Sequence, residues 1–291
     1  MIKRDVSAKF INLIGLCIWL VMFGHILERI PALSTNICGW LVYSFHSALF
    51  VACMGRITHF NWKWSAALYA LSLLTPAWWI GTTALCALTI PLLQKVSTRW
   101  RWLAVLMAII CGVIFGFCPD PHGIAAKLHL TRTFAFYPYF MFGAFGLCEK
   151  TNTKAKYICA ALTIATSIVA GCIAAWKPLP FLMSMAYMPG SAINTYIWRI
   201  VAYVIGFGMV YATISFMKST PWKGLYATGL TALTVYITHN YVITIAVGFT
   251  KMLGSLITLP VAAGIITVIF ITALTIICRG AWRIIHKGGA I

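Results

Sequence analysis

Charged residues are scarce in this sequence. Asp, Glu, Lys and Arg make up 9% of its 291 residues, whereas 62% are hydrophobic. A soluble globular protein carries about 25% charged residues, so this composition excludes a soluble enzyme or a soluble binding module. The sequence predicts an all-α, polytopic integral membrane protein.

Acidic residues are the rarest charged type. Asp5, Glu28, Asp120 and Glu149 are the only four, and none falls inside a predicted membrane span. Proton-coupled transporters commonly rely on carboxylates within the membrane, so this scarcity counts against that class. A general base within the membrane is then expected to be His, Tyr, Cys or Lys.

Patterns for metal and nucleic-acid binding are also missing. The ten cysteines form no C-x-x-C, and no His, Cys or carboxylate ligands are closely paired, so no metal site is expected. A disulfide between Cys38 and Cys118 stays open. The net charge of +18 would suggest nucleic acid in a soluble protein. Here most Lys and Arg lie between apolar runs, so the expected partner is membrane lipid and not nucleic acid.

Long apolar runs dominate the chain. A span needs about 20 apolar residues, and Pro76 divides the longest run because proline removes a helix donor and clashes with the preceding turn. No repeat, linker or soluble domain interrupts the runs, so 1–291 is expected to form a single membrane domain. The first run is followed by no A-x-A-like site and is expected to act as its own insertion signal. The ten predicted spans are 8–27, 37–58, 64–75, 77–94, 102–118, 133–148, 156–176, 196–216, 226–248 and 254–278.

The basic residues predict the orientation of these spans. With ten spans and a cytoplasmic N-terminus, most Lys and Arg fall on the inner side, as the positive-inside rule requires. Both termini are then cytoplasmic. The basic residues left on the outer side are Arg29, Lys127, Arg132, Lys177, Arg199 and Lys251.

Five cationic or titratable side chains then fall in the outer half of the bundle, each on a different span. His46 lies about 13 Å below the outer edge at 1.5 Å per residue, and His239 lies at a similar depth. His25 lies near the outer end of the first span, and Arg132 and Arg199 open the sixth and eighth. Ionisable residues inside membrane segments mark functional sites by default. For His46 and His239, a hydrogen bond between helices stays the alternative.

Four stretches set histidine, arginine or glycine into apolar runs. They are GLCIWLVMFGHI, ending at Ile26; SFHSALFVACMG, ending at Gly55; TRTFAFYPYFMFGAFG, from Thr131 to Gly146; and ATGLTALTVYITHNYVI, from Ala227 to Ile243. In this order they resemble segments of the membrane-bound acyltransferase 3 family, which O-acylates surface glycans. The matching family patterns are an LVVLGH-like first helix, FHMPLFFFISG, SRTFFFFPFFLLGY and GxxSLxIYLLHxxxI.

Two positions depart from that family. Arg or Lys usually lies eleven positions before the first-helix histidine, where this chain has Ile14, and the nearest cation is Lys9. The histidine of the family's HLWFLxAL helix is also missing, with Ala77 and Trp78 in that region. A divergent member with weakened activity that serves as an interaction protein therefore stays open. So does a transporter or flippase for a glycan or a lipid-linked intermediate.

The resemblance implies an enzyme of the bacterial inner membrane. It would move an acetyl or similar short acyl group from acetyl-CoA to a hydroxyl of a glycan acceptor, such as an O-antigen or exopolysaccharide. This transfer needs a base for the hydroxyl proton and donors for the oxyanion on the thioester carbonyl. His25 is the candidate base, with an interfacial anchor as the alternative. His46 is expected to orient the base or to donate to the oxyanion.

Substrate contacts are expected from His239, Arg132, Tyr137, Phe140 and Arg199. The planar fork of Arg132 can grip an acceptor oxygen or a phosphate-bearing donor, or the side chain can snorkel to the interface. The aromatic residues at 137 to 140 can line a sugar or acyl path, or form an aromatic belt beside a proline kink. Arg199 is interpreted first as an interfacial anchor and second as a ligand.

Overall fold

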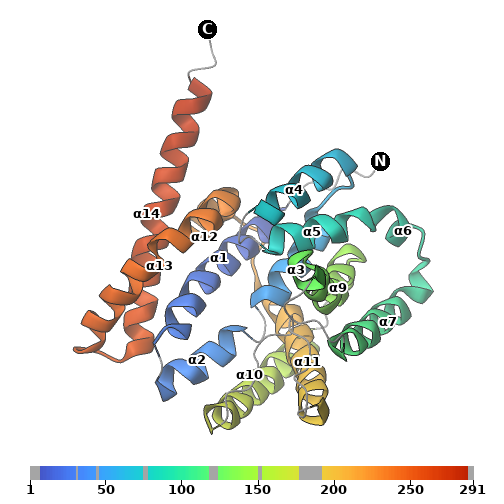
Figure 1. Cartoon of the computed structure of the whole chain (residues 1–291), viewed down its shortest axis with the longest axis horizontal. Helices are drawn as coiled ribbons and strands as arrows, with labels where there is room; N and C mark the ends of the chain where they lie inside the picture. Colours follow the sequence, from blue (N-terminus) through green and yellow to red (C-terminus); the bar gives the residue numbers. More distant parts are fainter. Residues whose placement is uncertain are drawn as a thin grey trace. The chain divides into compact units, whose positions relative to one another are not determined.

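The structure is a computed structural model that describes residues 7–30, 32–43, 46–74, 78–117, 124–149, 153–176 and 192–287. Within these ranges all regular secondary structure is helical (Figure 1), which confirms the predicted all-α class. The helices are α1 (Ala8–Glu28), α2 (Leu33–Tyr43), α3 (His46–Ile57), α4 (Trp62–Leu74), α5 (Trp78–Leu88), α6 (Ile90–Gln94), η1 (Thr98–Trp100), α7 (Arg101–Ile114), η2 (Phe115–Phe117), α8 (Ile124–Lys127), α9 (Leu130–Ala144), η3 (Leu147–Glu149), α10 (Thr153–Trp176), α11 (Ala192–Phe216), α12 (Lys223–Leu230), α13 (Ala232–Gly254) and α14 (Leu259–Lys287).

Several helices have the length and composition of membrane spans. In the part of the chain that is described, four qualify: Ala8–Glu28, Ile37–Ile57, Arg199–Phe216 and Leu259–Ala281. A fifth arises if the two segments of α13, bent by 67° between His239 and Tyr241, count as one span. These helices support an integral membrane protein. Ten spans with both termini in the cytoplasm stay a prediction.

The exposed side of α14 supports the same conclusion. Large apolar side chains are exposed there along most of the helix, at Val261, Ile265, Val268, Ile269 and Ile276. An apolar stripe of this length would be an aggregation hazard in water, whereas lipid tails solvate it. This stripe therefore has the composition expected of a lipid-facing surface.

The chain divides into two compact units. One comprises Met1–His46, Ser167–Pro178 and Met217–Ile291, and the other comprises Ser47–Thr166 and Leu179–Phe216. The expectation of a single membrane domain stays a prediction.

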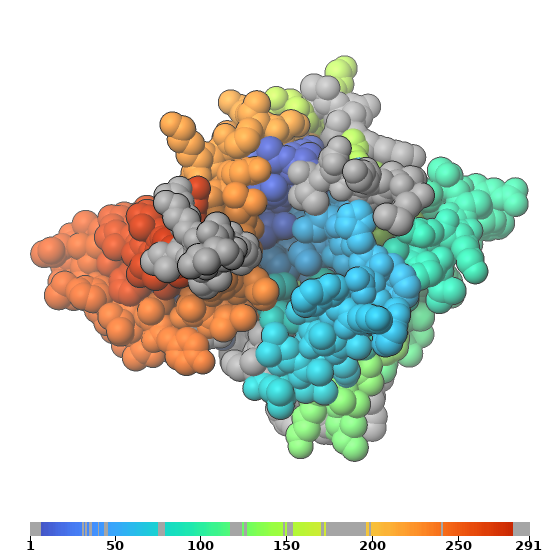
Figure 2. Space-filling view, turned by 90° about the horizontal axis from the view of Figure 1, so that it is seen from above, coloured from blue at the N-terminus to red at the C-terminus, as the bar shows by residue number. Residues whose placement is uncertain are grey.

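In the first unit, α1 packs against α2, α12, α13 and α14, and α13 runs beside α14 (Figure 1). The atoms of α13 and α14, coloured orange to red, form one continuous mass in the space-filling view (Figure 2). The crossing of α1 and α12 is so close that a Cβ on Gly15 would overlap the Leu225 carbonyl, and one on Gly229 would overlap that of Ile11. Glycine at both positions lets the two backbones touch.

A buried amide fixes the other end of this crossing. Asn12 is fully buried on α1, and its side-chain N–H donates to the Thr220 carbonyl at 2.9 Å. Its side-chain oxygen accepts from the backbone N–H of Trp222 at 3.1 Å. Since Trp222 precedes the first turn of α12, Asn12 joins α1 to the segment that starts α12.

In the second unit, α9 is the central helix and packs against α5 and α7. Its crossing with α3 repeats the glycine pattern, because a Cβ on Gly55 would overlap the Phe140 carbonyl and one on Gly143 would overlap that of Ala52. Behind this crossing, the hydroxyl of fully buried Tyr139 donates to the Ala202 carbonyl on α11 at 3.3 Å.

Each of the four stretches that resemble the acyltransferase family thus supplies one glycine, and these four glycines form two helix crossings. Gly15 and Gly229, from the first and last stretches, meet in the first unit. Gly55 and Gly143, from the second and third, meet in the second unit. The glycines of these stretches therefore have a structural reason that does not depend on the chemistry of the neighbouring histidines.

Candidate active site

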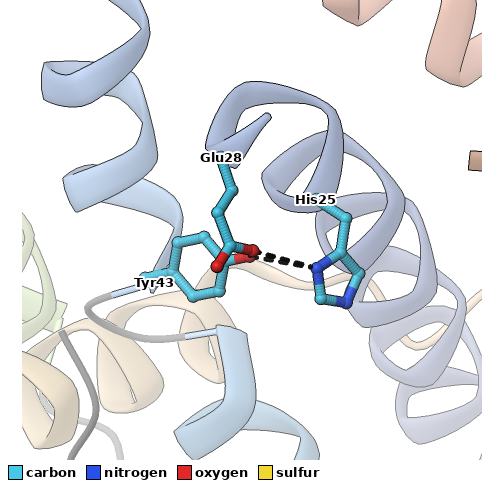
Figure 3. Close-up of polar contacts among 3 residues, drawn as sticks. All are labelled: His25, Glu28 and Tyr43. Atoms are coloured by element: carbon cyan, nitrogen blue, oxygen red, sulfur yellow. Dashed lines mark hydrogen bonds and ion pairs between the residues drawn. The ribbon is translucent and has the colours of Figure 1, made fainter. Parts of the chain in front are cut away.

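The last turn of α1 carries a histidine and a carboxylate that contact each other. His25 and Glu28 are three residues apart, which places them on one face of the helix, and Nδ1 of His25 lies 3.3 Å from Oε2 of Glu28. Tyr43, the last residue of α2, joins them from a second helix (Figure 3). Its hydroxyl lies 2.8 Å from the same Glu28 oxygen and 3.2 Å from Nδ1 of His25.

These contacts determine where the protons lie. An ionised carboxylate only accepts hydrogen bonds, so the Tyr43 hydroxyl donates to Glu28 and Nδ1 of His25 carries its own proton. That N–H then points to the Glu28 and Tyr43 oxygens together. The neutral imidazole therefore keeps its lone pair on Nε2, the nitrogen that can act as a base.

His239 lies against His25 from α13. The two rings stack with centroids 5.4 Å apart and planes 14° from parallel. His239 is the last residue of the first segment of α13, just before the 67° bend. Its Nδ1 donates to the carbonyl oxygen of Tyr236, three residues earlier. Because backbone groups freed at a helix break within a membrane need new partners, this bond stabilises the bend.

His46 is the first residue that the structure describes after Tyr43. It is the first residue of α3, and its Nδ1 lies 2.9 Å from the carbonyl oxygen of Val42 near the end of α2. Its ring meets Tyr43 edge-on, with centroids 5.0 Å apart. Since His46 comes four residues after Val42, this bond ties the ring to the preceding turn of the candidate span Ile37–Ile57. This bond supports the structural alternative for His46 over a donor to an oxyanion.

The three histidines therefore share one tautomer. Each uses Nδ1–H for a structural hydrogen bond and, when neutral, keeps its lone pair on Nε2. His25 is half-exposed at 36%, whereas His46 and His239 are buried at 5% and 1% exposure. Of the three, His25 combines a carboxylate partner with access for a substrate, which favours it as the base.

Arg29 adds a fixed positive charge at the same end of α1. Its guanidinium donates to the hydroxyl of Thr244 on α13 at 3.2 Å. This contact joins the end of α1 to α13 five residues beyond His239. It therefore helps to hold the helix ends that carry the stacked His25 and His239 rings.

The other predicted site residues belong to the second unit. Arg132 is half-buried in the first turn of α9. The Tyr137 hydroxyl donates to Thr89 at 2.8 Å, and its ring stacks on fully buried Phe140. Arg199 is 6% exposed and donates to the Gly112 carbonyl at 2.9 Å, which joins α11 to α7; its interpretation as an anchor stays a prediction. A common cavity for all seven predicted residues stays a prediction.

Glu28 and Tyr43 were missed as site residues by the sequence interpretation. The first span was predicted to end at residue 27, which left Glu28 outside it, whereas α1 continues through Glu28. The spacing of three residues from His25 is a signal in the sequence that could have identified the pair. Tyr43 carries no comparable signal, because its contact with His25 depends on how α2 packs against α1.

No group of three or more His, Cys, Asp or Glu side chains that could hold a metal ion occurs among the described residues. Of the cysteines considered for a disulfide, Cys38 lies on α2, and Cys118 lies outside the described residues. Compared with known proteins, the chain matches no family model, no curated protein and no solved structure.

Proposed function

We propose that this protein is an integral membrane O-acyltransferase that moves an acetyl or similar short acyl group from acetyl-CoA to a glycan hydroxyl. The observation that carries the proposal is the arrangement at the end of α1, where Glu28 and Tyr43 hold Nδ1 of His25. The ordered resemblance of four stretches to the membrane-bound acyltransferase 3 family supports the same activity. The proposed setting is the bacterial inner membrane, with ten spans and both termini in the cytoplasm.

In the proposed reaction, Nε2 of His25 removes the proton of the acceptor hydroxyl as its oxygen attacks the thioester carbonyl. The new C–O bond forms, the C–S bond breaks, and the imidazolium returns the proton to the departing thiolate of coenzyme A. The Glu28 carboxylate orients the ring and stabilises the imidazolium, the role that a carboxylate has beside a catalytic histidine. Atoms and charges balance with no further reactant.

The developing oxyanion needs positive charge or N–H donors. Neutral His46 uses its N–H for Val42 and so cannot donate from Nε2. Arginine has five N–H donors in a fixed fork, which supports Arg29, at the same end of α1 as His25, as a candidate for this role. Because acetyl-CoA is cytoplasmic and the histidines are predicted in the outer half, the proposal also requires the pantetheine arm to enter the bundle or the acyl group to be relayed.

Mass spectrometry of surface glycans tests the activity. Four matched strains would carry the intact gene, a deletion, His25→Ala or His59→Ala. His59 lies between α3 and α4, is exposed and belongs to the other unit from His25, so it is the matched control. An acyl-sized mass increment is expected only with the intact gene and His59→Ala. Identical profiles in the intact and deleted strains would overturn the proposal and favour transport assays in vesicles.

A further inference from the structure

One nitrogen beside the proposed base has no role in the mechanism above. His239 is 1% exposed, and no hydrogen-bond partner meets its Nε2 within the described ranges of the chain. Because Nδ1 donates to the Tyr236 carbonyl, the neutral ring has an acceptor lone pair at Nε2. Buried polar groups in native proteins are nearly always paired, so this acceptor requires a donor from outside the described chain.

The position of this acceptor indicates the kind of donor. The His239 ring stacks on His25 at 5.4 Å between centroids, so a donor that pairs with its Nε2 would lie close to the proposed base. A sugar hydroxyl donates one hydrogen bond, and most sugars carry a second hydroxyl on the adjacent carbon. A thioester or an acyl chain offers no donor to this nitrogen.

We infer that His239 binds the acceptor sugar through a second hydroxyl, adjacent to the one that His25 deprotonates. His239 is then a specificity-determining residue for an acceptor with a vicinal diol. Its bond to Tyr236 fixes the tautomer that this recognition needs. The inference rests on the proposed acyl transfer and goes beyond it, because it specifies which hydroxyls of a glycan the enzyme can modify.

A pair of acceptors tests the inference. One is an oligosaccharide released from the glycan that the wild-type protein acetylates. The other is the same oligosaccharide with the hydroxyl next to the acetylated position replaced by hydrogen, which removes the donor without adding bulk. Purified protein in lipid nanodiscs would transfer acetyl groups from acetyl-CoA to each, and kcat/KM would be compared. The variants are His239→Phe, which keeps a flat ring against His25, and His239→Gln, which keeps an acceptor oxygen.

Wild-type protein is expected to prefer the diol acceptor by roughly tenfold or more, since the deoxy analogue leaves a buried acceptor unpaired. His239→Phe should lose this preference for the diol acceptor, whereas His239→Gln should retain part of it. Equal use of both acceptors by active wild-type protein would overturn the inference alone, as would an unchanged preference in His239→Phe. If His239→Phe does not fold, the wild-type ratio and His239→Gln decide. Absence of transfer to either acceptor would overturn the proposed function and this inference with it.

Discussion

Replacing Glu28 with glutamine removes the charge beside His25 and keeps the length of the side chain. At the 3.3 Å that separates Nδ1 of His25 from Oε2 of Glu28, two unit charges attract by about 1 kcal/mol in water and about 5 kcal/mol at an effective dielectric of 20. Exposed fractions of 36% and 59% place this pair near the aqueous limit. A loss of about 1–2 kcal/mol of transition-state stabilisation predicts a roughly 5- to 30-fold fall in kcat.

Steady-state acetyl transfer by the purified protein measures this effect. We expect kcat to fall in Glu28→Gln while KM stays constant, because the imidazolium forms only during the reaction. Glu149→Gln is the matched control, since Glu149 pairs with Arg56 in the other unit, and its kcat should stay at the wild-type value. Tyr43→Phe removes a neutral hydroxyl and should cause a smaller fall. A folded Glu28→Gln protein with wild-type kcat would refute the assignment of Glu28.

Three further predictions concern stability and are measured by thermal unfolding in detergent. Gly15→Ala should destabilise the first unit by about 1–3 kcal/mol, because its new methyl group overlaps a backbone carbonyl. Gly248→Ala has no atom near the added methyl group and should leave stability unchanged or raised. Equal effects of the two substitutions would contradict the close crossing of α1 and α12. Asn12→Leu should cost about 1–3 kcal/mol, since it removes the hydrogen bonds by which this buried side chain joins Thr220 and Trp222; a wild-type melting temperature would count against those bonds. Burial lowers the pKa of His129 at the start of α9. The unfolded chain then binds a proton that the folded chain resists, so stability should fall as pH drops below 6.5. His129→Asn, which suits the φ of 59° at this position, should lose less stability between pH 7.5 and 5.5, and an unchanged loss would exclude His129 as its source.

Much of the helical framework could be predicted from apolar runs alone. The first predicted span, 8–27, differs from α1 by one residue, and the predicted spans 196–216 and 226–248 overlap α11 and α13. The runs could not show that α13 bends beside His239. An apolar run looks the same on either side of a bend. The predicted span 37–58, in contrast, ends one residue beyond the candidate span Ile37–Ile57.

The candidate site could be predicted only in part. A buried imidazole requires hydrogen-bond partners, so histidines within apolar runs were predicted as site residues. This pattern identified His25, His46 and His239. The partners themselves depend on packing: Tyr43 comes from α2, and His239 reaches His25 from more than 200 residues away. For His46, a polar group in a membrane segment indicated a function, whereas its bond to Val42, four residues earlier, favours a structural role.

The most direct test of the central claim is acetyl transfer in a defined system. Radiolabelled acetyl-CoA, the isolated glycan and the purified protein in lipid nanodiscs would be combined, with wild type, His25→Ala and His59→Ala compared at equal folded concentration. We predict that label enters the glycan with wild type and His59→Ala, and that His25→Ala lowers the rate at least 100-fold, the lower end of what a general base contributes. Transfer at the wild-type rate by His25→Ala, or no transfer by any of the three proteins, would contradict it.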